Sequence, residues 1–190
     1  MPRIEPLPPD QWPAEMRDAL AAMRPPNPRH PLPSRAEGRP KGLNALGALA
    51  HHPELTKAFN TFNGHVQFAT TLTARQRELL ILRIAAVRDA AYEWAQHAVL
   101  AADAGLSTDE VAAIVDGPDA GEWPPVERAM LRAVDELIAT ATVTDATWSA
   151  LADHLDTQQL MDVVFTVGAY DTVAMAFKAF GVELDSDLQK

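Results

Sequence analysis

Three side chains in the middle of the chain have the residue types and spacing for proton transfer. Glu93 and His97 are four residues apart, so a helix places them on one face. Glu78 precedes them in a separate apolar segment. A carboxylate beside an imidazole orients the ring and supports proton transfer near neutral pH. The structural alternatives are a surface Glu93–His97 pair, and for Glu78 a helix-dipole contact or a pair with Arg75 or Arg77.

Four further residues are candidates for contacting a substrate. Arg83, or an arginine of the N-terminal region, could hold an anionic group. His65 precedes the key segment and could line the same pocket, although a lone helical histidine is more often structural. Trp94 and Tyr170 could form pocket walls, and the alternatives are core packing for Trp94 and a buried hydroxyl pair with Asp171 for Tyr170.

Several kinds of chemistry have no residues to support them. The chain contains no cysteine, which excludes disulfides, thiolate nucleophiles and cysteine-ligated zinc. Nucleophile-elbow, P-loop and dinucleotide-binding motifs are also missing. No cofactor is expected. A metal held by Glu78, Glu93, His97 and His65 is an alternative, but bundle di-iron proteins use Glu-x-x-His and this spacing is Glu-x-x-x-His.

The elements that must position these residues are helices. Apolar residues recur at helical spacing from Leu43 onward, and no alternating strand pattern stands out. Capping boxes begin at Thr73 and Ser107, with a looser relative at Asp156. The expected fold is all-α, with short loops between antiparallel neighbours. The predicted helices are 43–51, 54–70, 73–89, 90–104, 107–116, 125–140, 144–154, 156–168 and 169–180.

Proline separates the first 42 residues from the rest. Eleven of the fifteen prolines lie in residues 1–40, where regular helix or central strand is disfavoured. One short helix is expected from Gln11 to Met23, with Asp10 as its cap and Pro13 in its first turn. Residues 24–42 are expected to form an extended arm that packs on its own domain or clasps a neighbouring subunit. The arm's basic residues are Arg24, Arg29, Arg35, Arg39 and Lys41. The predicted division is therefore an arm at 1–42 and a helical domain at 43–190.

The composition favours a soluble cytoplasmic protein. Hydrophobic residues make up 47% of the 190 residues, which is enough for a substantial core. The net charge of −10 argues against binding nucleic acid. Residues 101–190 carry four basic and seventeen acidic side chains, which we interpret as a solvated surface. No signal peptide and no uninterrupted apolar run of membrane-spanning length is evident.

One stretch resembles a known family. Arg77-Glu78-Leu79, an apolar helix, Glu93-Trp94-Ala95-Gln96-His97 and then Ala104-Gly105-Leu106-Ser107 are similar to the carboxymuconolactone decarboxylase family, which includes alkyl hydroperoxidase D-type proteins. The resemblance covers residues 50–117 well and extends loosely through 165–171. It implies an alkyl hydroperoxidase D-like helical bundle that assembles as a homo-oligomer. The proline-rich arm lies outside the pattern.

The resemblance also locates the missing cysteines. The peroxidase branch carries Cys-x-x-Cys-x-x-x-His with a glutamate one helix earlier. His97 matches the histidine and Glu78 the glutamate, whereas Ala90 and Glu93 stand at the two cysteine positions. Thiol-based peroxide reduction is therefore not expected, because the thiolate is both nucleophile and electron carrier.

The remaining residues resemble the acid–base equipment of the cysteine-free lactone decarboxylase branch. The resemblance implies His97 as general acid/base, Glu93 as the residue that orients it or shares its proton, and Glu78 as part of the same polar cluster. The expected function is a lyase or related lactone/enol reaction on a small molecule. The alternatives are a non-catalytic binding or structural oligomer on the same fold, or a metal-dependent enzyme at the same cluster.

Overall fold

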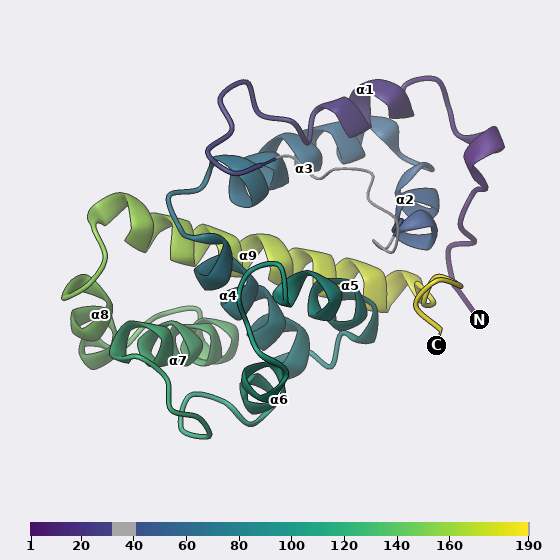
Figure 1. The fold of residues 1–190 in the computed structure, drawn as a ribbon. Helices are drawn as coiled ribbons and strands as arrows, with labels where there is room; N and C mark the ends of the chain where they lie inside the picture. The colour runs from purple at the N-terminus through teal and green to yellow at the C-terminus, as the bar shows by residue number, and fades with distance from the viewer. Residues whose placement is uncertain (32–40, 190) are drawn as a thin grey trace. The chain divides into compact units, whose positions relative to one another are not determined.

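The computed structural model describes residues 1–31 and 41–189 (Figure 1). Arg35 and Arg39 of the predicted arm lie outside them. Within these ranges the chain forms helices joined by loops and no strand, which confirms the all-α prediction. Contacts divide the chain into two compact units. The first comprises Met1–Thr70 and Met175–Lys190, and the second comprises Thr71–Ala174. The predicted boundary at residue 42 stays a prediction.

The second unit is built around one central helix. Helix α4 (Ala74–Val87) packs against α5 (Ala91–Ala101), α6 (Thr108–Asp116) and α7 (Pro125–Thr140), and α7 packs against α8 (Asp145–Ala152) (Figure 1). A four-residue apolar run in α4, Leu79 to Leu82, is fully buried. A helix that is apolar nearly all round must be covered on several sides, which is why α4 occupies the centre.

Local sequence fixes where these helices begin. Thr73 accepts a hydrogen bond from the Gln76 backbone, and the Gln76 side chain accepts one in return from the Thr73 backbone. Ser107 and Glu110 form the same reciprocal pair at the start of α6. Asp156 and Gln159 do so before α9. The capping predictions are confirmed.

The two helices predicted at 156–168 and 169–180 form one continuous helix, α9 (Thr157–Phe180). The predicted break is wrong because a glycine within a helix costs only about 1 kcal/mol, which packing can offset. Val163, Val167 and Tyr170 are buried around Gly168. By length and composition α9 is able to cross a membrane, and half of its most apolar window is buried inside the protein.

The first unit contains η1 (Pro9–Gln11), α1 (Met16–Ala21), α2 (Leu43–Leu49), α3 (Pro53–Gly64) and the π-helix η2 (His65–Ala69). The N-terminal helix is shorter than the predicted 11–23, and Asp10 does not cap it. Trp12 precedes a proline and is therefore held in an extended conformation, with ψ 135°. Helix α1 can begin only after this break.

The predicted helix 54–70 is present as α3 followed directly by the π-helix η2, so the helical backbone continues from Pro53 to Ala69. At Gly64 the backbone lies close to Met23, whose carbonyl oxygen would be 2.6 Å from a Cβ at this position. The described part of the arm packs on the same unit, since the backbone N–H groups of Arg29 and His30 donate to the Phe68 carbonyl oxygen. The clasp on a neighbouring subunit stays a prediction.

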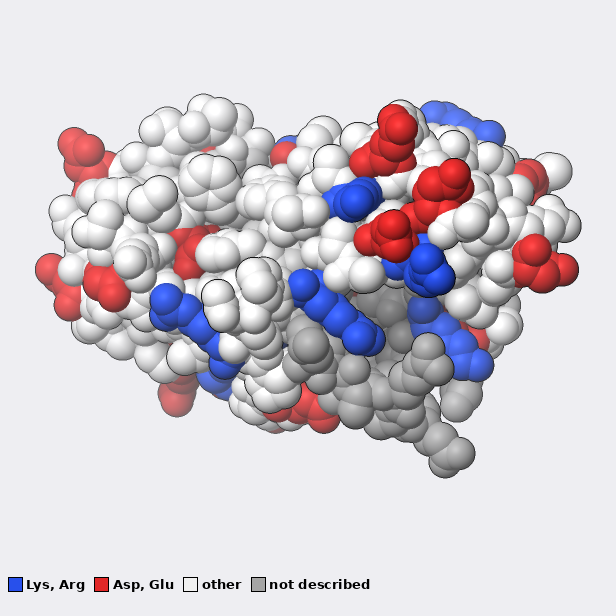
Figure 2. Space-filling view, turned by 90° about the horizontal axis from the view of Figure 1, so that it is seen from above, with Lys and Arg blue, Asp and Glu red and all other residues white. Residues whose placement is uncertain are grey.

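The surface in Figure 2 carries basic and acidic side chains among large uncharged areas.

Candidate functional site

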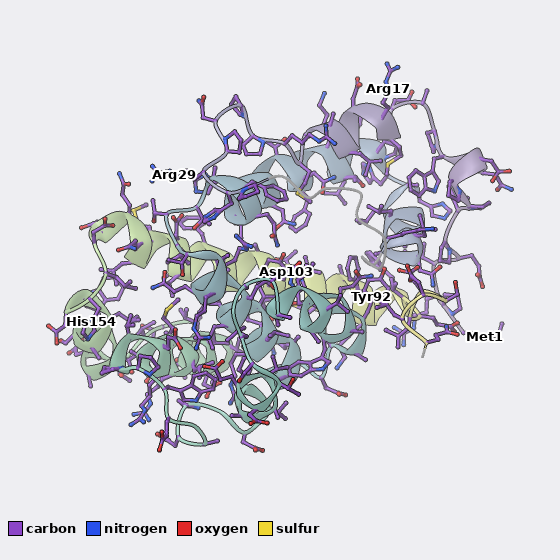
Figure 3. All side chains as sticks on the ribbon, viewed as in Figure 1. Met1, Arg17, Arg29, Tyr92, Asp103 and His154 are labelled. Atoms are coloured by element: carbon purple, nitrogen blue, oxygen red, sulfur yellow. The ribbon has the colours of Figure 1, made fainter. Side chains whose placement is uncertain are left out.

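Helices α4 and α5 bring two of the predicted residues into direct contact. The Nδ1 atom of His97 lies 2.7 Å from Oε2 of Glu78, and both residues are buried. His97 lies on α5. Figure 3 labels Tyr92 near the beginning of that helix and Asp103 just beyond its end. Glu78 is in the second turn of α4. The predicted pairing of Glu78 with this histidine is thus present as a hydrogen bond between neighbouring helices.

Glu78 also contacts Arg77, as one of the structural alternatives proposed. The guanidinium of Arg77 lies 3.3 Å from Oε1 of Glu78, so one carboxylate oxygen faces this guanidinium and the other faces the imidazole of His97. Burial alone would raise the pKa of Glu78, but the interactions with His97 and Arg77 outweigh it and hold the pKa below its ordinary value. Glu78 is therefore a carboxylate that accepts the Nδ1 proton of His97.

This hydrogen bond fixes which imidazole nitrogen is available for chemistry. With Nδ1 donating to Glu78, Nε2 is the atom that takes up or releases a proton. No described residue hydrogen-bonds to Nε2. The side chain of His97 is 11% exposed, whereas that of Glu78 is 2% exposed. The pair can therefore act as a proton donor or acceptor toward a bound molecule.

Tyr170 of α9 completes the wall around the imidazole. Its ring meets the His97 ring edge-on, with centroids 5.1 Å apart and planes at 86°. Burial first, then the nearby Glu78 and Glu93, raise the pKa of Tyr170 well above its ordinary value. The phenol stays neutral at physiological pH. The carboxylate of Asp171 binds Arg88 at 2.5 Å. It therefore does not form the alternative hydroxyl pair with Tyr170.

Glu93 is buried but is not hydrogen-bonded to His97. Only 3% of the residue is exposed, and neither carboxyl oxygen has a partner among the described residues. Burial, reinforced by the negative charge of Asp171, raises the pKa of Glu93 to about 9. Glu93 is therefore a neutral carboxylic acid at pH 7. Glu93 and His97 lie one turn apart on the same face of α5, but the predicted contact between them does not form.

The Arg88–Asp171 pair beside Glu93 was not among the predicted site residues. Arg88 caps the end of α4, and Asp171 lies 83 residues later on α9. The only sequence signal was the loose extension of the family pattern through residue 171. The pair matters because Asp171 contributes to keeping Glu93 protonated.

The side chain of Arg83 makes structural contacts within the second unit. Its guanidinium binds both carboxylate oxygens of Asp135, at 2.7 and 2.9 Å, and the carbonyl oxygens of Ile114 and Val115. These contacts use its donors to fasten the end of α6 to α7. A substrate would have to displace them, so the geometry does not support the substrate-binding role predicted for Arg83.

Trp94 and His65 complete the predicted set. Trp94 is half-buried and packs against the buried alanines Ala85, Ala90 and Ala174, as the core interpretation proposed. His65 is an exposed residue of η2 in the first unit, and its role at the site stays a prediction. In residues 1–31 and 41–189, no three His, Asp or Glu side chains are grouped to hold a metal ion.

Comparison with known proteins identifies the segment that carries this cluster. Residues 53–136, which include Glu78, Glu93 and His97, match the carboxymuconolactone decarboxylase family. No curated protein matches the chain significantly.

Solved structures similar to this chain share its fold. A protein of unknown function from Agrobacterium tumefaciens, a putative antioxidant defence protein AhpD, aligns with a TM-score of 0.67 and 22% identity over 72% of this chain and 94% of its own. A peroxidase-related protein from Ralstonia eutropha with an alkylhydroperoxidase AhpD core aligns with a TM-score of 0.69 and 18% identity, over 86% of this chain and 95% of its own. These likenesses confirm the alkyl hydroperoxidase D-like fold.

A third neighbour is an enzyme with a stated activity. The debrominase Bmp8, solved as a cysteine-to-alanine variant in complex with 2,3,4-tribromopyrrole, aligns with a TM-score of 0.72 and 13% identity. The alignment covers 98% of this chain and 93% of the debrominase. At this identity the likeness concerns the fold.

Proposed function

We propose that this protein is a cysteine-independent acid–base enzyme, acting as a lyase or in related lactone/enol chemistry on a small molecule. The observation that carries the proposal is the buried 2.7 Å hydrogen bond between His97 Nδ1 and the Glu78 carboxylate. An ionised carboxylate that holds one imidazole nitrogen leaves the other poised for proton transfer, as in other acid–base sites.

The proposed reaction is the loss of CO₂ from a carboxylated, unsaturated lactone. The bond between the ring carbon and the carboxylate breaks, and its electron pair delocalises toward the lactone carbonyl oxygen as a dienolate. The protonated Nε2 of His97 then returns a proton to carbon, and solvent restores that proton. The charge on Glu78 stabilises the imidazolium before the transfer.

Glu93 has a different role from the one its spacing suggested. As a neutral acid with no internal partner, it can donate a hydrogen bond to a developing enolate oxygen. Glu93 and His97 are only four residues apart in sequence, but in this proposal they contribute to different steps of the reaction. In this proposal Glu93 stabilises negative charge on oxygen, and His97 moves the proton to carbon.

Thiol chemistry is not part of the proposal. The chain has no cysteine, and the positions of the family's redox pair hold Ala90 and Glu93. The debrominase neighbour is named for removing bromine, and its solved complex contains a brominated pyrrole. A planar, electron-rich ring of about the size of that pyrrole is therefore a second probe for binding. Binding of such a ring would not imply debromination.

The direct test combines decarboxylation with solvent exchange. A carboxylated muconolactone is incubated with the protein, and CO₂ release is measured. In parallel, an unsaturated lactone without the carboxylate is incubated in D₂O, and deuterium incorporation at carbon is followed by NMR. We expect both activities in the natural chain and a loss of about 10²–10⁴-fold in His97→Ala.

His154→Ala is the matched control, because His154 is exposed near the end of α8 and has no contact with the cluster. Iodoacetamide should leave the activity intact, since there is no thiol to alkylate. Activity that survives in His97→Ala would overturn the proposal. Saturable binding of the lactone without turnover would favour the non-catalytic alternative. We also propose a homo-oligomer, and sedimentation equilibrium measures its mass directly.

A further inference from the structure

A hollow in the Thr71–Ala174 unit is lined by none of the residues of the acid–base pair. It has a volume of about 360 Å³ and lies between α7 and α8. Its lining includes Trp123, Arg128, Arg132 and Thr147, with the small side chains of Ala146 and Ala150. Pockets that hold small molecules range from about 300 to 1,000 Å³, so this space suits a single ring with few substituents.

The loop before α7 is joined to two residues of the groove lining, Arg132 and Trp123. Asp119 of the loop binds Arg132 of α7 at 2.8 Å. Trp123 at the end of the loop is 5% exposed, so its ring is fixed by packing. Its indole nitrogen lies beside Gly121, where a Cβ would come within 2.9 Å, and the indole N–H has no acceptor among the described residues. The aromatic wall of the groove is thus rigid.

The groove brings two basic side chains together in the most acidic part of the chain. They lie beside Glu136, whose carboxylate accepts a hydrogen bond from Thr147 and interacts with the charge of Arg132. Residues 101–190 contain only four basic side chains against seventeen acidic ones, and two of the four line this groove. Arg128 and Arg132 are one helical turn apart on α7, so their guanidinium groups share a face.

The two arginines differ in availability. Arg128 is exposed and makes no ion pair or side-chain hydrogen bond with any described residue. Arg132 is bound to Asp119, but both side chains are largely exposed, and an exposed ion pair contributes little. A carboxylate can therefore bind Arg128 and compete with Asp119 for Arg132.

We propose that the groove between α7 and α8 is a binding site for a small planar organic carboxylate. The carboxylate binds Arg128 and Arg132 through charge-assisted hydrogen bonds, for which guanidinium geometry is suited. The flat body of the ligand lies against Trp123 and the alanine side chains of α8. This site shares no residue with Glu78, Glu93 or His97, so the inference holds whether or not the proposed activity is confirmed.

Benzoate is the probe, and the indole N–H resonance of Trp123 in a ¹H–¹⁵N correlation spectrum is the reporter. The chain has four tryptophans, and Trp123→Phe identifies the signal by its disappearance. We expect a saturable shift with benzoate, and at least tenfold weaker binding of benzamide, which has the same ring without the charge. The backbone signals of Arg128 and Ala129 provide a second readout if Trp123→Phe is poorly folded.

Arg128→Ala and Arg132→Ala remove the proposed contacts at exposed positions, where folding should be preserved. We expect each to weaken benzoate binding, and the double variant to weaken it at least tenfold. Arg17→Ala removes an exposed arginine of the first unit and should leave binding unchanged. The inference is overturned if benzoate gives no saturable shift, if benzamide binds equally well, or if the double variant binds like the natural chain.

Discussion

His97 on α5 donates its Nδ1 proton to the carboxylate of Glu78 on α4, over 2.7 Å between two buried side chains. Nineteen residues separate them in sequence, and the packing of α4 against α5 brings them together. Glu78 is the only one of the two predicted glutamates that contacts the imidazole. Its charge fixes the ring orientation and leaves Nε2 without a hydrogen bond to any described residue.

Glu78→Gln should remove this control of the imidazole without removing the side chain. The amide lacks the charge that stabilises an imidazolium, and its NH₂ group can face Nδ1 and reverse the tautomer. We expect the rate of the proposed reaction to fall by about 10²-fold or more. The ¹⁵N shifts of the His97 ring should show protonated Nδ1 in the natural chain and a tautomer mixture in the variant.

A change in rate without a change in the ring tautomer would contradict this account of Glu78. Glu122→Gln provides the control, because Glu122 is exposed and the substitution removes the same charge.

Glu93→Gln should make the protein more stable at neutral and alkaline pH. The folded pKa of about 9 lies above the ordinary 4.5, so the folded state holds the proton more tightly than the unfolded state. The contribution of Glu93 to stability is therefore greatest below pH 4.5 and is lost as the pH rises toward 9. This linkage costs about 3 kcal/mol between pH 4.5 and pH 7.

Urea unfolding at pH values from 5 to 9 measures this effect. The free energy of unfolding should decline with pH more steeply in the natural chain than in Glu93→Gln. Parallel slopes for the two proteins would show that Glu93 is not a buried neutral acid. The activity of Glu93→Gln should fall less than that of Glu78→Gln, because the amide still donates a hydrogen bond.

Arg83→Met should lower stability and leave substrate affinity unchanged. The variant keeps much of the apolar stem but leaves Asp135 and two carbonyl oxygens without their cation. We expect a loss of about 2 kcal/mol in the free energy of unfolding. A rise in KM with normal stability would instead restore the substrate-binding role expected from the sequence. Arg17→Met, in an exposed pair, should cost under about 0.5 kcal/mol.

Glu110→Gln should weaken the protein at neutral pH but not in acid. Hydrogen bonds from Arg75 and Ser107 lower the pKa of Glu110 to about 2, so its stabilisation is present above pH 4.5 and is lost as the pH falls toward 2. Because Glu110 is partly exposed, the effect at pH 7 should be about 1 kcal/mol. Gln still completes the capping box, which isolates the charge effect.

Acid titration of unfolding tests this prediction. The difference between the natural chain and Glu110→Gln should shrink as the pH approaches 2. Asp109→Asn is the neighbouring control in the same helical turn, and it should show no comparable pH dependence. A difference that stays constant in acid would rule out the charge of Glu110 as its origin.

The sequence determined the features that depend on neighbours along the chain. Thr73 with Gln76 and Ser107 with Glu110 set helix starts, because a cap and its partner are three residues apart and meet once the first turn forms. The apolar run of α4 implied its burial, and the absence of cysteine excluded thiol chemistry. The spacing of Glu93 and His97 placed them on one helix face.

Tertiary structure decided which polar side chains meet and which remain alone. Spacing could not show that His97 pairs with Glu78 rather than Glu93, because the partner comes from another helix. The neutral state of Glu93 depends on burial and on Asp171, 78 residues later in the chain. The commitment of Arg83 to Asp135 and the continuity of α9 through Gly168 likewise result from packing. Charge, burial and hydrogen-bond partners are properties of surroundings in space, which residue types and local spacing do not specify.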